Sequence, residues 1–344
     1  MVRIVSMVLV LLITLCRGGS PRTALAQEAS PTVVGSPVAG ITDTGKAAVA
    51  FVREITGDDD PLSAPYGVAI GPDGSVYVTD AAANHVRVFD ADGASVGTIG
   101  GPGREEGQLQ FGGADDSIYL ATDLAGNIYV ADTENHRIQK FDPDGRFLLA
   151  FGSFGTGEGQ FVHGFGVAIG PDGSIYVADD DRSDVQKFDP TGQFLLKFGS
   201  YGTGEGQFLN PGTPTVDGEG HVWITDAEGS KVQEFGPDGE LLAAWGSSGS
   251  GPGQLDGPTA VAIDAAGHVF VSEAGNGRVQ VFDRGGHYLT AWDGAETPSG
   301  PFTEVANVVL DGRSTVYVVD IGTPRVAVFE LLPPLASDLG TPIP

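Results

Sequence analysis

Residues 127–132 read "NIYVAD", and variants of this short motif occur six times in a chain of 344 residues. In every copy, a run of β-branched and aromatic residues ends on an acidic residue, and a phenylalanine follows nine positions later. The acidic residues are Asp80, Asp132, Asp179, Asp226, Glu273 and Asp320, at spacings of 52, 47, 47, 47 and 47. An internal repeat of this length determines the fold before any single element is assigned.

Each copy divides into four predicted strands. In the first copy they cover residues 67–70, 75–78, 86–89 and 95–99, with Gly, Pro, Asp and Asn in the turns and loops between them. β-branched and aromatic residues favour strands, and the turn residues separate one strand from the next. Six four-stranded units of about 47 residues predict an all-β fold, a six-bladed β-propeller with antiparallel blades.

The two ends of the repeat region predict how the ring closes. The sixth copy stops after its third strand, at residues 325–330, whereas a strand-like segment, "AVAFVREI" at 48–55, precedes the first copy. We expect this N-terminal strand to complete the last blade, because radial closure leaves only short sheet edges. The predicted propeller spans residues 47–332, between a flexible Pro/Gly/Thr-rich tether at 27–46 and a C-terminal tail at 333–344.

Residues 1–26 have the pattern of an export signal peptide. Arg3 precedes an apolar run at 4–16, and "ALA" at 24–26 provides small residues for cleavage. The apolar run is short for a membrane span. We therefore expect a secreted or cell-surface protein, with a signal retained as an uncleaved anchor as the alternative. The single cysteine, Cys16, lies in this segment, so an intramolecular disulfide is excluded.

The net charge of the chain disfavours some classes of binding partner. The chain has 18 Lys and Arg residues against 45 Asp and Glu residues, a formal net charge of −27. Nucleic-acid binding depends on basic patches that neutralise phosphate, and anionic lipid repels an acidic protein. The sequence therefore predicts no nucleic-acid partner and no membrane association beyond the anchor alternative. It does not indicate an oligomeric state.

Residues 126–161 resemble the NHL repeat, which is named for an Asn-His-Leu signature. Asn135 and His136 match the first two letters, and the resemblance extends over all six copies. It implies a six-bladed propeller of an exported, bacterial-type member. NHL proteins include sensor domains of bacterial receptor kinases, interaction domains of tripartite-motif proteins and a peptide-amidating lyase, so the resemblance leaves the activity open.

Glycine-rich loops follow the fourth strands. "FGSFGTGEGQF" at 151–161 and "FGSYGTGEGQF" at 198–208 differ at one position. A phosphate-binding loop leads into a helix, whereas a strand follows each of these loops and neither contains lysine. We therefore interpret them as joints that carry the chain from one blade to the next, with the final Phe filling the seam between blades.

Four of the acidic residues that end the second strands have a cation five positions later. These pairs are Asp132 with Arg137, Asp226 with Lys231, Glu273 with Arg278 and Asp320 with Arg325. One interpretation is a ring of cations for an anionic ligand. We favour the other, in which each carboxylate holds its loop through backbone N–H groups, because the acidic residue occurs in every copy.

Positions that break the repeat are better candidates for a site. Aligned residues just before the first strand are polar in four copies and should lie near the mouth of the channel, and residues 110–116 contain a five-residue insertion. The resulting candidates for ligand binding are Tyr66, Asp115, Asp116, His163, Phe165, Asn210 and Glu304. The weaker candidates for a divalent cation, calcium or zinc, are Asp116, His163, Asn210 and Glu304. A solvated rim without a metal is the alternative.

Two functions remain open at this point. The first is a non-catalytic module that binds a peptide, protein or glycan on its loop face and has no catalytic residues or fixed cofactor. The second is a metal-dependent lyase or lactone hydrolase with its site at the channel mouth. The amidating lyase binds zinc through converging histidines, but only His163 occupies a channel-mouth position here. We therefore favour the binding module.

Overall fold

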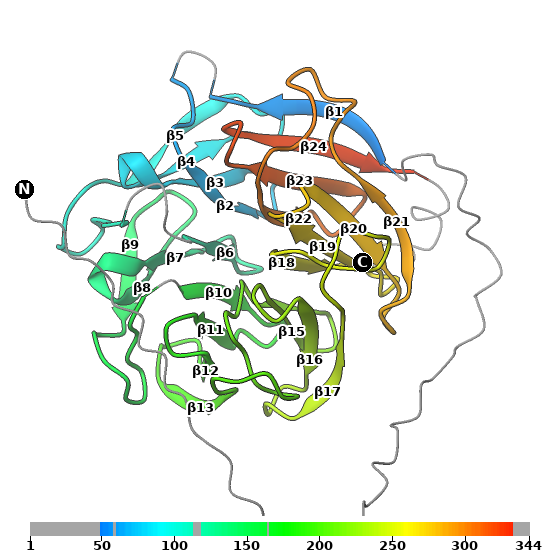
Figure 1. The fold of residues 1–344 in the computed structure, drawn as a ribbon. Helices are drawn as coiled ribbons and strands as arrows, with labels where there is room; N and C mark the ends of the chain where they lie inside the picture. The colour runs from blue at the N-terminus through cyan, green and yellow to red at the C-terminus, as the bar shows by residue number, and fades with distance from the viewer. Residues whose placement is uncertain (1–48, 58–59, 113–117, 164, 333–344) are drawn as a thin grey trace, which may run out of the picture. The chain divides into compact units, whose positions relative to one another are not determined.

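The computed structural model describes residues 49–57, 60–112, 118–163 and 165–332, and these form six four-stranded antiparallel sheets arranged around a centre (Figure 1). This arrangement confirms the predicted six-bladed propeller. In each blade, the first strand lies nearest the centre and the fourth lies at the outside, because the strands pair in sequence order. Blade six is the exception, since its outer strand comes from the start of the chain.

The strands of the six blades follow the predicted repeat. Blade one contains β2 (Pro65–Ile70), β3 (Val76–Asp80), β4 (His85–Phe89) and β5 (Ser95–Gly100). Blade two contains β6 (Leu120–Thr122), β7 (Ile128–Asp132), β8 (Arg137–Phe141) and β9 (Phe147–Phe151). Blade three contains β10 (Phe165–Ile169), β11 (Ile175–Asp179), β12 (Asp184–Phe188) and β13 (Phe194–Phe198).

Blade four contains β14 (Thr215–Val216), β15 (Val222–Asp226), β16 (Lys231–Phe235) and β17 (Leu241–Trp245). Blade five contains β18 (Pro258–Ile263), β19 (Val269–Glu273), β20 (Arg278–Phe282) and β21 (Tyr288–Trp292). Blade six contains β22 (Val305–Leu310), β23 (Thr315–Asp320), β24 (Arg325–Leu331) and β1 (Val49–Ile55). The helices of the described residues are two single 3₁₀ turns, η1 (Ala81–Ala83) and η2 (Thr133–Asn135), and neither is long enough to cross a membrane.

The N-terminal strand closes the ring. β1 pairs antiparallel with β24, with Val49 opposite Leu331 and Ile55 opposite Val326, and the pairing is interrupted by a bulge after Phe51. The blue strand β1 lies along the red strand β24 in Figure 1. The predicted closure is therefore confirmed, and the first strand of the chain protects an edge that the last blade would otherwise expose.

The core lies in the seams between blades. The second strands β7 and β11 are buried along their whole length. One buried cluster joins Tyr129 and Ile138 of blade two to Phe165 and Val167 of blade three. Each fully buried side chain of this size contributes about 1.5–3 kcal/mol through the hydrophobic effect. The phenylalanines that follow the acidic residues are at most 1% exposed: Phe89, Phe141, Phe188, Phe235, Phe282 and Phe329.

The inner strand of blade four departs from the repeat. β14 has two residues, whereas β18 in the next blade has six. Pro211 and Pro214 precede β14, and proline has no N–H group to donate to a strand ladder. Isolated bridges from Pro211 to Asp226 and from Thr213 to Ala260 hold this segment instead.

Candidate functional site

The acidic residue that ends each second strand is structural. All six are at most 1% exposed. Asp226 accepts hydrogen bonds from the backbone N–H groups of Leu209 and Asn210, at 3.1 and 3.0 Å, and from that of Gly229 at 3.1 Å. The carboxylate therefore fixes the loop that enters its blade and the turn that follows its own strand. This confirms the structural interpretation of the repeated acidic residue.

The cations five positions later hold the glycine-rich joints. Arg137 pairs with Asp132 at 2.7 Å, and its Nη2 donates to the carbonyl oxygens of Glu105 and Gln108 at 2.8 and 3.0 Å. Lys231 and Arg278 make equivalent contacts in blades four and five. In blade three, where Asp184 replaces the cation, Arg182 takes over and donates to Gly157 and Gln160. These cations are engaged by the protein itself and do not form a ring open to an anionic ligand.

A glutamine on the third strand completes each joint. Gln186 accepts from the Gly159 N–H at 2.8 Å and donates to the Gln160 carbonyl at 2.8 Å. Gly155 has φ of +146°, and a Cβ atom there would lie 2.3 Å from Gln160 Oε1, so the turn requires glycine. The final Phe161 is fully buried between the blades. The prediction that this loop is a joint is confirmed.

The structure places two of the predicted aromatic candidates in or beside the core. Phe165 is fully buried and stacks on Phe161, with 4.9 Å between ring centroids. Its ring faces the seam between blades two and three, and is not presented at the channel mouth as expected. Tyr66 is partly buried and packs edge-on against Tyr119, at 6.0 Å. Successive side chains of a strand point to opposite faces of its sheet, and these two point toward neighbouring blades.

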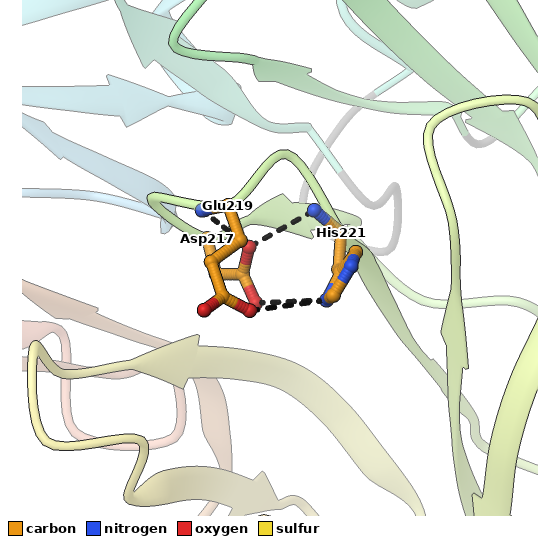
Figure 2. Close-up of side chains that lie close together, drawn as sticks. All are labelled: Asp217, Glu219 and His221. Atoms are coloured by element: carbon orange, nitrogen blue, oxygen red, sulfur yellow. Dashed lines mark hydrogen bonds and ion pairs between the residues drawn. The ribbon is translucent and has the colours of Figure 1, made fainter.

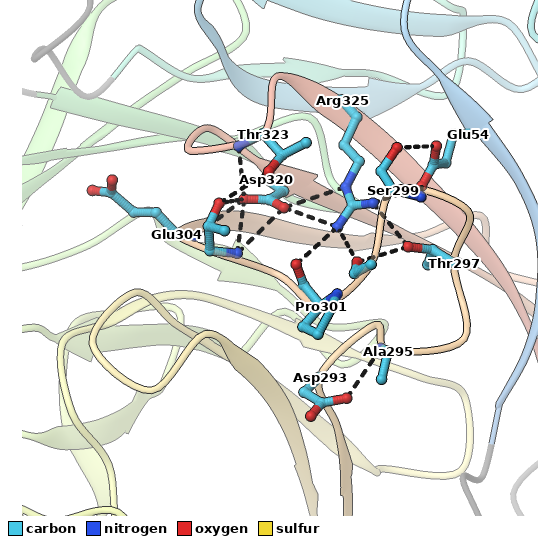
Figure 3. Close-up of polar contacts among 12 residues, drawn as sticks. Glu54, Asp293, Ala295, Thr297, Ser299, Pro301, Glu304, Asp320, Thr323 and Arg325 are labelled. Carbon is cyan, nitrogen blue, oxygen red and sulfur yellow. Dashed lines mark hydrogen bonds and ion pairs between the residues drawn. The ribbon is translucent and has the colours of Figure 1, made fainter.

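The polar candidates are not brought together as a cation site. His163 is partly exposed and its Nε2 lies 3.5 Å from Glu134 Oε1, in blade two. Asn210 contributes its backbone to the Asp226 network, and Figure 3 shows the exposed side chain of Glu304 extending away from Asp320. Among the described residues, no cluster of metal-binding side chains contains any of the three. Asp115 and Asp116 lie outside the described residues.

A cluster with metal-ligand chemistry lies instead on the opposite face. Asp217, Glu219 and His221 present ligand atoms within 4.8 Å of one another, in the turn between β14 and β15 (Figure 2). Arg284 of blade five donates to Asp217 at 3.0 Å and also contacts His221 and Glu234. The guanidinium therefore already pairs with the carboxylates of Asp217 and Glu219. We interpret the cluster as an ion-pair network that joins blades four and five.

Two exposed aromatic side chains on the loop face were not expected from the sequence. Phe154 and Tyr201 occupy the same position in successive joints and are 67% and 73% exposed. The equivalent positions in the other two joints hold Pro102 and Ser248, so the joint does not require an aromatic ring there. The ring of His136 lies 4.8 Å from that of Phe154. The sequence did contain one indication of these two rings, which is an aromatic residue in a joint that is otherwise glycine-rich and polar.

Comparison with known proteins identifies the family to which this fold belongs. The family model described as "NHL repeat" matches residues 120–141 and 255–282, which fall in blades two and five, and the six blades share one pattern. The chain belongs to the NHL-repeat propellers. A 50-residue segment of this NHL propeller is 44% identical to "Protein brain tumor" of Drosophila melanogaster, and the match covers 14% of this chain and 5% of that protein.

Solved structures share the propeller fold at low sequence identity. A streptogramin B lyase is 15% identical with a TM-score of 0.55, over 81% of this NHL propeller and 97% of that chain. Virginiamycin B lyase from Staphylococcus aureus is 14% identical with a TM-score of 0.56, over 81% and 99%. A protein of unknown function from Bacteroides thetaiotaomicron is 15% identical with a TM-score of 0.58, over 78% and 70%. At these identities the likeness concerns the fold alone.

The loop face of the NHL propeller also carries two carboxyl groups with raised pKa values. Burial raises the pKa of Asp179 to about 6, and burial together with the charge of Asp181 raises the pKa of Asp180 to about 7. The Oδ1 atom of Asp180 is buried and has no hydrogen-bond partner among the described residues. The Asp180 carboxyl group therefore titrates near neutral pH, within the electrostatic reach of His163.

The described residues that line the cavity at the centre of the NHL propeller carry no charge. A cavity of about 260 Å³ is lined by the six inner strands, and the described lining residues include no Asp, Glu, Lys, Arg or His. Most of the lining is aliphatic, including Val68, Leu120 and Ile169. Proton transfer and metal binding need ionisable or coordinating side chains. Within the described residues, such groups occur outside the channel.

Proposed function

We propose that this NHL propeller is an exported, non-catalytic binding module that takes a peptide, protein or glycan on its loop face. The observation that carries the proposal is the exposure of Phe154 and Tyr201, 67% and 73%, on successive joints of that face. Exposed aromatic side chains bury a large area when a ligand covers them, and aromatic residues dominate the energetics of interfaces. Burying each ring contributes about 1.5–3 kcal/mol.

The frame beneath these two rings supports a binding role. Joint 151–161 is held by Gln186 and Arg182, and joint 198–208 by Gln233 and Lys231. Each joint is also closed by a buried phenylalanine, Phe161 or Phe208. A surface held in one conformation loses little entropy when a ligand binds. The two rings are therefore displayed from rigid loops, and a single extended ligand would contact neighbouring blades.

Export and partner class rest on the sequence. The signal-like residues 1–26 support a secreted or cell-surface location, and the net charge of −27 argues against a nucleic-acid ligand. Glycan and peptide ligands both stack on exposed aromatic rings, and neither requires a cationic surface. No oligomeric state is proposed.

No observation on the described residues favours the alternative, a metal-dependent lyase or lactone hydrolase. His163 faces Glu134, and Asn210 and Glu304 contribute no ligand atoms to a converging cluster. The resemblance to streptogramin lyases is at 14–15% identity and carries no residue assignment. The described residues therefore give no structural support for calcium or zinc binding at this face.

The test is a screen of the purified propeller against glycan and peptide arrays. We expect ligands that are retained by the wild-type protein and lost by the double variant Phe154→Ala/Tyr201→Ala. The matched control is Leu124→Ala, because Leu124 is 87% exposed in the turn between β6 and β7, on the opposite face. Ligands bound equally by the double variant and the wild type would overturn the proposal.

A further inference from the structure

A second pocket lies where the ring closes, on the face opposite the joints. Its volume is about 340 Å³, and its walls come from three places. Strand β1 contributes Val52 and Arg53, and blade six contributes Arg313 and Tyr317. The first turn of blade one contributes Ile70, Gly71, Pro72 and Gly74. The pocket is therefore complete only when β1 occupies its place in blade six.

Two arginines of this pocket have no ion-pair partner among the described residues. Arg53 donates from Nη2 to the Ala91 carbonyl at 2.6 Å, but its Nε is buried and has no hydrogen-bond partner. Arg313 is exposed, and only its backbone N–H is engaged, by Asp311. Other arginines of this acidic chain pair with carboxylates: Arg87, Arg137, Arg146, Arg182, Arg278, Arg284 and Arg325.

The hydroxyl group of a largely buried tyrosine completes the donor set. Tyr317 is 4% exposed and lines the pocket. The equivalent Tyr129 and Tyr176 donate to Asp123 and to the Pro237 carbonyl, whereas the Tyr317 hydroxyl donates to no described acceptor. Burial and Asp311 raise the pKa of Tyr317, whereas the charge of Arg53, its hydrogen bond to the phenol oxygen and the charge of Arg313 oppose that rise. Both cations therefore lie near the phenol oxygen.

The pocket also contains two carboxylates, which limit the negative charge of any ligand that can bind there. Asp311 accepts the N–H groups of Arg313 and Thr315 through one oxygen, at 2.8 and 3.0 Å, and so is partly committed to its turn. Glu330 is exposed at the edge. The two guanidinium groups offset the charge of these two carboxylates, so the pocket has no large positive potential. Its N–H and O–H groups can still donate hydrogen bonds to a ligand. Such a site suits one small anionic head group and not a polyanion.

We propose that this pocket binds a small molecule through a carboxylate or phosphate head group, with Arg53, Arg313 and Tyr317 as donors. The guanidinium fork matches the oxygens of either head group. Because the walls come from β1, blade one and blade six, a bound anion holds the closing seam together. Ligand binding therefore stabilises the closed ring, by the linkage between binding and folding.

The test measures thermal unfolding of the full chain with inorganic phosphate and, separately, acetate, each against sodium chloride at equal ionic strength. We expect a saturable rise in Tm with at least one anion, and the arm that responds identifies the head group. Arg313→Ala and Tyr317→Phe should each weaken binding at least tenfold. Arg104→Ala is the control, because Arg104 is an exposed arginine in a joint on the other face.

Three results overturn the proposal. The first is the absence of a saturable rise with either anion. The second is an equal response of Arg313→Ala and the wild type, and the third is an equal loss in Arg104→Ala. Arg313 is exposed and makes no side-chain contact that the fold requires, so its variant stays folded and the comparison holds. The outcome is independent of the loop-face function, since Phe154 and Tyr201 are unchanged in every variant.

Discussion

Arg325 of β24 donates through Nη1 to the Glu54 carboxylate of β1 at 2.6 Å, across 271 residues of sequence. The arginine is fully buried and also contacts Asp320 at 3.0 Å, Thr297 at 2.8 Å and the Gly300 carbonyl at 2.7 Å (Figure 3). Burial raises the pKa of Glu54, but hydrogen bonds from Ser299 and Arg325 hold it below its usual value. The closing strand is therefore attached by a charged network as well as by backbone pairing.

Replacing Glu54 with alanine should destabilise the propeller by about 3 kcal/mol, because it removes one of the two carboxylates that pair with the buried guanidinium of Arg325. Urea unfolding measures this change. Asp144→Ala is the control: Asp144 pairs with Arg146 at the same 2.6 Å, but both side chains are about 70% exposed, and exposed pairs contribute less than about 1 kcal/mol. Equal losses in the two variants would show that the network does not support closure.

Deleting residues 49–55 removes the outer strand of blade six. We expect a loss of several kcal/mol, from the apolar area of Val49 and Ile55 and from the unpaired edge of β24. Calorimetric unfolding of the deleted chain measures it. A melting temperature unchanged from that of the full chain would contradict a closure made by β1.

The joints of blades four and five are held by different cations, a lysine and an arginine, so the effects of alanine and lysine at Arg278 can be compared. Arg278→Ala removes the pairing with Glu273 and the hydrogen bonds to Gly251 and Gln254, so we expect a loss of about 2–3 kcal/mol. Arg278→Lys should retain more than half of this, because Lys231 already reaches the equivalent carbonyls in blade four, at 3.0 and 2.9 Å. Chemical denaturation of both variants tests the structural role. If both leave the stability unchanged, the cations do not hold the joints.

The raised pKa of Asp180 predicts a pH dependence of stability. The folded group has a pKa of about 7, against 3.8 for its ordinary value, so the folded chain keeps a proton that the unfolded chain releases. The stability that depends on this proton is fully present below pH 3.8 and is lost as the pH rises through about 7. Asp180→Asn should therefore gain on the order of 2 kcal/mol over the wild type above pH 7 and little in acid. Melting curves at several pH values measure the difference, and a pH-independent difference would refute the assignment.

The fold followed from the sequence because its determinants are local and repeated. The acidic residue at Asp132 and the phenylalanine at Phe141 recur at the same spacing in the other copies. The missing fourth strand of the last copy also had a visible counterpart in residues 48–55. Closure was predictable for this reason, although the Arg325–Glu54 contact was not, since neither residue belongs to a motif shared with the other.

The candidate site was less predictable, for reasons of geometry. Position along the chain placed Phe165 near the channel mouth, but the direction of its Cα–Cβ bond sends the ring into the seam beside Phe161. The neighbour of His163, Glu134, comes from blade two, and the position of His163 along the chain does not indicate that contact. Phe154 and Tyr201 were overlooked because the repetition of their joint indicated architecture, and exposure is a property of the folded surface.

The most direct test of the loop-face proposal is calorimetric titration of the best ligand from the array into three proteins. These are the wild type, Leu124→Ala and Phe154→Ala/Tyr201→Ala. Loss of two buried rings should raise Kd at least a hundredfold in the double variant, while Leu124→Ala binds as the wild type does. An unchanged Kd in the double variant, with its melting curve intact, would contradict the claim that this face binds through Phe154 and Tyr201.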